Sequence, residues 1–209
     1  MKALKFICLA TALLIPQATY SQRRASSIRS VDFANFTFPA KPIYSDGKKS
    51  FRLKDGTYQG RPGIVGAPAP FGLPYPVSLV GTGYGELTHD DKEEAMVVLA
   101  ESVAGTAIPF YVYIYSMRGD RPEFLWAFAA GDRGDGGLRK VYAENGELVV
   151  ELYGKNTGIG DIGDKEEAGA CCPKSFTRTR YRRRGGRFRQ KGCREVLPNP
   201  LPNAELLMS

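Results

Sequence analysis

One short stretch of the sequence carries oxygen-bearing side chains in a pattern that could bind a metal ion. From Gly85 to Glu94 the chain reads GELTHDDKEE. The candidate ligands stand at alternate positions and then four residues further on: Glu86, Thr88, Asp90 and Glu94. Calcium takes several oxygens from alternate residues of a loop, in which a glycine permits the sharp turn. Asp91 stands where that glycine is expected, so a calcium loop and a solvated acidic turn are both retained as interpretations.

A second stretch concentrates positive charge. Residues 171–194 contain ten Lys or Arg residues and no Asp or Glu, in a chain whose formal net charge is +7. The Gly-Gly pair at 185–186 predicts a hairpin that places Arg182 opposite Arg189. Alternation along both strands then gathers arginines on one face. The six residues of this face are Arg178, Arg180, Arg182, Arg184, Arg187 and Arg189.

Such a face needs counter-charge, because like charges directly opposite each other in a ladder are destabilising. The acidic remainder of the domain can supply it, as can solvent and salt, and arginine also deters edge-to-edge pairing of strands. The alternative is a polyanionic partner: nucleic acid, lipopolysaccharide, teichoic acid or a sulfated glycan. On the other face, Tyr181 and Phe188 are expected to pack inward.

Catalytic chemistry has little support in the sequence. His89 is the only histidine, and no Gly-x-Ser-x-Gly motif is present. The glycine-rich run 131–137 precedes a strand pattern and not a helix, which favours a structural turn over a phosphate cradle. Asp and Glu residues are plentiful, so a carboxylate-dependent hydrolase remains an alternative.

The N-terminus has the pattern of a secretory signal peptide. Lys2 and Lys5 precede the apolar run 6–15, and small residues at Thr19 and Ser21 predict cleavage before residue 22. The run is shorter than the roughly 20 residues of a membrane span, and no later segment is apolar enough to cross. We therefore expect a secreted or periplasmic protein.

Export places the remaining cysteines in an oxidising compartment. Three stay after the leader is removed: Cys171, Cys172 and Cys193. A bridge from Cys172 (or Cys171) to Cys193 is preferred, and a vicinal bridge between the adjacent pair is the alternative. The preferred bridge would close a loop of about twenty residues and stabilise the fold by about 3 kcal/mol. Three thiols with His89 make a poor zinc site.

Strand patterns outnumber helix patterns after the leader, and we expect a mainly β fold: an antiparallel meander forming a sandwich or rolled sheet, with long Pro/Gly-rich loops. Phe110 to Met117 alternates two apolar sets, which indicates a central strand covered on both sides. Asn145-Gly146 predicts a hairpin tip. The other expected elements are a first strand at 31–39, a short hairpin around 54–56, a strand at 94–99 and a strand at 123–129 with Phe124, Trp126 and Phe128 on one face.

The expected organisation is a signal peptide at 1–21, a mobile basic arm at 22–30, a single β-rich domain at 31–197 and an unpaired tail at 198–209. Within the domain, residues 40–78 hold many Pro and Gly residues and are expected to be rich in loops.

Three elements in this order resemble a family of exported bacterial β-rich proteins. GELTHDDKEEAMVVL is similar to the acidic loop of FG-GAP and VCBS repeat proteins, of the type GDLTGDGKEEA. GDRGDGGLRKVYAENGELVVEL and the ACCP…TRTRYR element complete the resemblance, which covers residues 83–190. It implies a secreted β-rich domain without assigned catalytic residues. The sequence thus favours a secreted, non-enzymatic cell-envelope protein with a structural or binding role, and the first alternative is a polyanion binder that uses the arginine hairpin.

Overall fold

The computed structural model describes residues 27–43, 49–59, 76–103, 108–132, 136–155, 157–160 and 173–200. In this part of the chain the protein is mainly β, and every pair of neighbouring strands is antiparallel. The expected fold class is therefore confirmed.

Two sheets form the body of the molecule. The five-stranded sheet has the order β3-β4-β5-β6-β7, made by Thr57–Gln59, Pro76–Gly85, Glu94–Glu101, Phe110–Arg118 and Arg121–Gly131. The four-stranded sheet has the order β11-β10-β9-β8, made by Arg187–Pro198, Ser175–Arg184, Glu147–Tyr153 and Leu138–Glu144. Within each of these two sheets, consecutive strands pair as neighbours, which is the meander that the sequence predicts.

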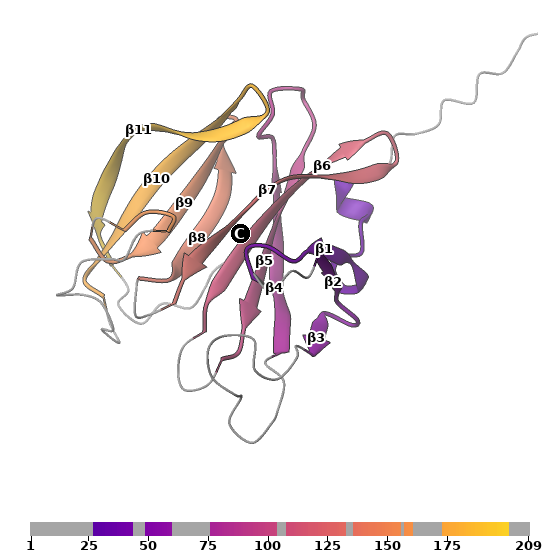
Figure 1. Ribbon diagram of the computed structural model, residues 1–209. Coiled ribbons are helices and arrows are strands. Elements are labelled where there is room, and N and C mark those ends of the chain that lie inside the picture. The colour runs from indigo at the N-terminus through magenta and orange to yellow at the C-terminus, as the bar shows by residue number, and fades with distance from the viewer. Residues whose placement is uncertain are drawn as a thin grey trace, which may run out of the picture.

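The five-stranded sheet lies between two other layers (Figure 1). The four-stranded sheet covers one face. The other is covered by the N-terminal segment, with the short 3₁₀ helices η1 (Ile28–Ser30) and η2 (Phe33–Asn35) and the two-stranded sheet of β1 (Thr37–Pro39) and β2 (Ser50–Arg52). The alternation of β6 serves both interfaces: Val112 and Ile114 are buried toward the four-stranded sheet, and Tyr113 toward the N-terminal layer. The prediction that this strand is covered on both sides is confirmed.

The N-terminal layer differs from two expectations. Residues 27–30 are not part of a mobile arm: Ile28 is buried, and Arg29 forms an ion pair with Glu93, with Nε–Oε2 at 2.6 Å. The expected strand at 31–39 is shorter, because Asp32 caps η2 by accepting a hydrogen bond from the Ala34 amide. An aspartate that can cap the next turn competes with extended backbone, and only residues 37–39 pair as a strand.

A β-bulge changes the expected face of one aromatic residue in β7. Ile114 pairs with Trp126, but the next residue, Tyr115, pairs with Phe124, so the register shifts by one residue between them. Trp126 consequently packs in the core between the two sheets, whereas Phe124 lies against Tyr115 on the opposite face and is 44% exposed. One extra residue reverses the in-out alternation beyond it, so the expectation of a common face was wrong for Phe124.

Turn chemistry is where the sequence was most informative. Asn145 and Gly146 have positive φ angles of 52° and 72° and join β8 to β9, as predicted. Asp55 and Gly56 form the expected tight turn, closed by a bridge between Lys54 and Thr57. The two strands beside it pair elsewhere, however, β2 with β1 and β3 with β4.

Two residues of the expected unpaired tail, Pro198 and Asn199, are paired with the strand β10 region. Pro198 still pairs with Ser175 at the end of β11. The Asn199 amide donates to the Lys174 carbonyl at 2.8 Å, and its side chain donates to the Pro173 carbonyl at 2.9 Å. Residues 201–209 and the predicted leader at 1–21 lie outside the described residues.

Candidate functional site

The predicted arginines share one face of the β10–β11 hairpin. Arg184 pairs with Arg187, Arg182 with Arg189, and Arg180 with Lys191, and directly opposed residues point to the same side of a sheet. Lys191 therefore joins the set. We call the seven residues the arginine face: Arg178, Arg180, Arg182, Arg184, Arg187, Arg189 and Lys191.

Two neighbouring glutamates neutralise the inner part of this face. Glu151 stands opposite Arg178 on β9, with Arg178 Nη2 2.8 Å from Glu151 Oε1. Arg180 Nη1 lies 2.5 Å from Glu144 Oε2 on β8, and this hydrogen bond raises the pKa of Arg180. Glu151, almost fully buried, also pairs with Arg139. The acidic part of the domain thus supplies counter-charge here.

A third glutamate, Glu147, marks the outer limit of this neutralised part. The residue is 4% exposed, and its Oε1 lies 2.5 Å from Lys191 Nζ and 3.4 Å from Arg182 Nε. The hydrogen bond from Lys191 is the main cause that lowers the pKa of Glu147. Glu147 therefore stays ionised at neutral pH and holds two cations of the arginine face in place.

Beyond Glu147, no carboxylate of the described residues pairs with this face. Arg184, Arg187 and Arg189, which we call the hairpin end, are exposed and form no ion pair within the ranges that the structure describes. A pocket of about 290 Å³ opens beside Arg184 and Arg189. It is lined by Arg182, Arg184, Arg189, Gln190, Lys191 and Gly192.

One guanidinium nitrogen of a pocket-lining residue is enclosed by the protein. The Nε atom of Arg182 is buried and makes no hydrogen bond to any described group, although it lies 3.4 Å from Glu147. A buried N–H without an acceptor is costly, and an anionic oxygen is the acceptor that suits a guanidinium best. The lining is cationic and amide, and none of these six residues is a carboxylate.

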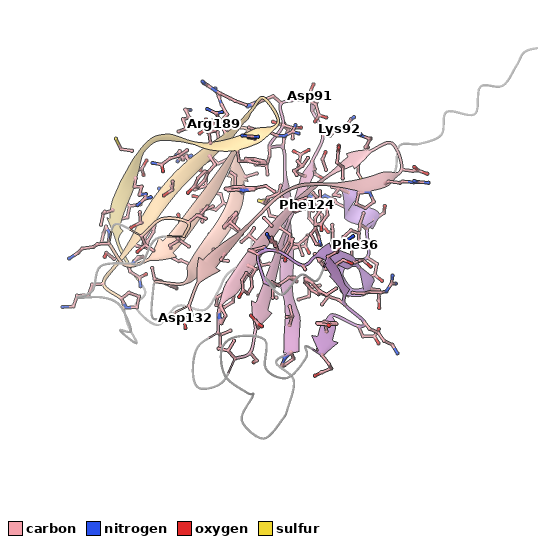
Figure 2. All side chains as sticks on the ribbon, viewed as in Figure 1. Phe36, Asp91, Lys92, Phe124, Asp132 and Arg189 are labelled. Atoms are coloured by element: carbon pink, nitrogen blue, oxygen red, sulfur yellow. The ribbon has the colours of Figure 1, made fainter. Side chains whose placement is uncertain are left out.

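Aromatic packing fixes the position of the hairpin end. The ring of Phe188 stacks on Trp126 of β7, with centroids 5.3 Å apart and an interplanar angle of 14°. Tyr181 contacts the same indole at 5.5 Å and is buried in the core between the sheets. The inward packing expected for these two side chains is confirmed. Figure 2 shows Arg189 at the same end of the molecule as Asp91, with Asp132 at the opposite end.

The acidic loop has a compact structure that uses its own oxygens. Glu94 is fully buried and accepts hydrogen bonds from the Leu87 amide at 2.7 Å and from Ser116 Oγ at 2.8 Å. Thr88 Oγ1 lies 2.9 Å from Asp90 Oδ1 and 3.2 Å from Glu94 Oε1. Glu86 accepts from the amides of Thr88 and His89.

This arrangement brings three of the four proposed calcium ligands together, namely Thr88, Asp90 and Glu94, and turns Glu86 toward backbone amides. Burial raises the pKa of Glu94, and its hydrogen bonds oppose that effect. Among the described residues, no group of three or more His, Cys, Asp and Glu side chains has an arrangement suited to a metal ion. Calcium binding here stays a prediction, and the loop's observed role is structural.

The other predicted sites fall partly outside the described residues. Cys193 is exposed on β11, and both predicted partners, Cys171 and Cys172, lie in an undescribed range. The disulfide therefore stays a prediction. Part of the glycine-rich run 131–137 is likewise not described.

Comparison with known proteins adds no identity: no family model, curated protein or solved structure matches the chain. Within the described ranges we find no helix with the length and apolar character of a membrane span.

Sequence reasoning did not find the row of Glu144, Glu147 and Glu151, nor the platform of Trp126. A signal for the glutamates does exist, because residues 147 and 151 share a strand face by alternation. It becomes meaningful only once β9 is known to lie beside β10. Nothing local in the sequence links Trp126 to residues more than fifty positions later.

Proposed function

We propose that the protein is an exported, non-enzymatic cell-envelope protein that binds an anionic polymer through the hairpin end of its arginine face. One observation carries the proposal: the face is divided. Arg178, Arg180 and Arg182 have carboxylate partners, whereas the three arginines of the hairpin end have none among the described residues. Two of these three, Arg184 and Arg189, border a cationic pocket.

Physical arguments support binding at this end over a purely structural role. Exposed guanidinium groups that are not neutralised attract polyanions and gain affinity from counterion release. Phe188 stacks on Trp126, so the hairpin end is held against the sandwich and less conformational entropy is lost on binding. Export is supported by the leader pattern of residues 1–21.

The test is retention on a heparin column, with the variant Arg184→Gln/Arg189→Gln. We expect the wild-type protein to bind at low salt and to elute only as salt rises, and the double variant to elute much earlier, because two unneutralised cations are lost.

The matched control is Arg118→Gln/Arg121→Gln. It removes the same charge from two exposed arginines that flank the β6–β7 turn, where Arg118 pairs with Glu123 at 2.8 Å. We expect it to elute close to the wild type. Passage of the wild-type protein through heparin and DNA columns at low salt would refute the proposal, and equal shifts of both variants would reduce it to a net-charge effect.

A further inference from the structure

We infer that the hairpin end is a short site for about three negative charges, carried by phosphate or sulfate groups, and not a track along which a long polyanion lies. The inference rests on the proposed function, and it specifies how much of the arginine face takes part and what chemistry it recognises.

The glutamates set the length of the site. Alternate residues on a strand are about 6.8 Å apart, so a polyanion following β10 from Arg184 would next meet Arg182, Arg180 and Arg178 in turn. Each of these three already faces a carboxylate, at 3.4, 2.5 and 2.8 Å. A polymer continuing in that direction would have to displace Glu147, Glu144 and Glu151 and would be repelled by them. Favourable contact therefore ends at Glu147.

The charges at the pocket set the charge of the ligand. Four cations line it, Arg182, Arg184, Arg189 and Lys191, and Glu147 contacts the first and last of them. Arg187 pairs directly with Arg184 and adds another exposed guanidinium. The three arginines of the hairpin end thus remain to be neutralised, while Glu147 pre-positions Arg182 and Lys191 on the wall.

The donor geometry sets the chemical group. A guanidinium offers a planar pair of N–H donors that matches two oxygens of a phosphate or sulfate. Arg184 and Arg189, which are exposed, each present such a pair at the pocket. A volume of about 290 Å³ suffices for one or two such groups with part of the unit that carries them.

A length series tests the size of the site. Calorimetric titration would compare inorganic phosphate, pyrophosphate, tripolyphosphate and long-chain polyphosphate, with a trisulfated heparin disaccharide as the arm that distinguishes sulfate from phosphate. We expect affinity to rise at least tenfold from phosphate to tripolyphosphate, or to the disaccharide if sulfate is preferred. From tripolyphosphate to long-chain polyphosphate, the affinity per occupied site should change less than about threefold. Affinity that keeps rising with chain length would overturn the inference.

Salt dependence gives an independent test with long heparin. Three free cations predict a slope of log K against log salt of about −2 to −3, whereas all seven residues of the arginine face predict about −5 to −6. A slope near −6 would overturn the short site and leave standing the binding of an anionic polymer by the arginine face as a whole. Absence of any binding would refute both.

The boundary itself is tested by removing its charge. Glu147→Gln should release Arg182 and Lys191 and steepen the slope by about two, and the half-exposed Glu144→Gln should release Arg180 and steepen it by about one. Glu123→Gln, which releases Arg118 at a distant turn, is the control and should leave the slope unchanged. Folding of each variant is checked by its near-UV spectrum. Unchanged slopes in folded Glu147→Gln and Glu144→Gln proteins would contradict the inference.

Discussion

Glu94 has no exposed surface, yet its carboxylate organises the acidic loop from within. One oxygen accepts the Leu87 amide, and the other accepts Ser116 Oγ and lies within reach of Thr88 Oγ1. These bonds compensate for part of the cost of burying a carboxylate, a cost that is visible in its raised pKa. A residue of the proposed calcium set thus works as an internal acceptor for the loop that leads into β5.

Replacing Glu94 by alanine should therefore destabilise the protein. The Leu87 amide, left without an acceptor, alone costs about 1 to 3 kcal/mol, and the lost side-chain packing adds to this cost. Glu94→Gln should cost less than half as much, since its amide oxygen can accept from Leu87 while the hydroxyl groups rotate to accept from its NH₂ group. Urea unfolding measures both. Equal losses in the two variants would show that the carboxylate charge itself is required, as in bound calcium.

Another buried carboxylate with a raised pKa, that of Glu101, predicts a pH effect. Glu101 is 5% exposed, and burial raises its pKa above the usual 4.5, while the hydrogen bond from the Tyr111 hydroxyl at 3.0 Å opposes the shift. The folded state therefore binds this proton more tightly than the unfolded chain does. The resulting stability is fully present below pH 4.5 and is lost as pH rises through the folded-state pKa.

Glu101→Gln should remove that loss and keep the hydrogen bond. We expect the free energy of unfolding of the wild type, relative to the variant, to fall as pH rises from about 4.5 to 7. Urea titrations of both proteins at three pH values measure the difference in free energy of unfolding. Glu94 is present in both proteins, so its own pH dependence cancels in that difference. A difference that stays constant with pH would contradict the assignment.

At the scale of elements, the β10–β11 hairpin has one face for charge and one for packing. Its outer face carries the arginines, and its inner face presses Phe188 and Tyr181 onto Trp126 of the other sheet. The end of the hairpin extends past β9, whose pairing with β10 ends at Tyr181 and Leu148. The aromatic contact therefore replaces sheet hydrogen bonds as the support of the hairpin end.

Phe188→Ala should loosen this support without changing any charge. Because the ring is only half-buried, we expect a loss of about 2 kcal/mol, smaller than the 3 to 5 kcal/mol of a fully buried phenylalanine. Heparin retention should weaken as the arginines lose their fixed positions. Phe124→Ala, on the opposite face and 44% exposed, is the control and should leave retention unchanged. Full retention by Phe188→Ala would show that the hairpin end binds without aromatic support.

The sequence predicted those features of the elements that depend on neighbouring residues. Alternation in β6 and the Asn145-Gly146 turn are local patterns, and both were confirmed. The bulge that turns Phe124 away was not predictable, because one extra residue in a strand leaves the apolar pattern almost unchanged. The glutamates that divide the arginine face come from other strands, so their role depends on sheet order and not on spacing.

At the scale of the whole molecule, three layers share two apolar cores. The five-stranded sheet contributes to both, since Val97 and Tyr113 face the N-terminal layer while Val98 and Val112 face the four-stranded sheet. Destabilisation in one layer should consequently reach the other through this central sheet. Single domains below about 150 residues usually unfold in such a cooperative manner, and the shared central sheet predicts the same for this longer chain.

Phe38→Ala tests this cooperativity from the layer farthest from the hairpin. Phe38 is fully buried between Phe51 and Tyr113, whose ring centroids lie 5.7 and 5.3 Å from its own. Loss of the Phe38 ring should therefore cost about 3 to 5 kcal/mol. Trp126, the single tryptophan, reports on the opposite core. If the layers fold as one unit, far-UV circular dichroism and tryptophan fluorescence should give the same lowered denaturation midpoint. A fluorescence midpoint that stays at the wild-type value, with a lowered circular dichroism midpoint, would mean that the N-terminal layer unfolds separately and that the two cores are energetically independent.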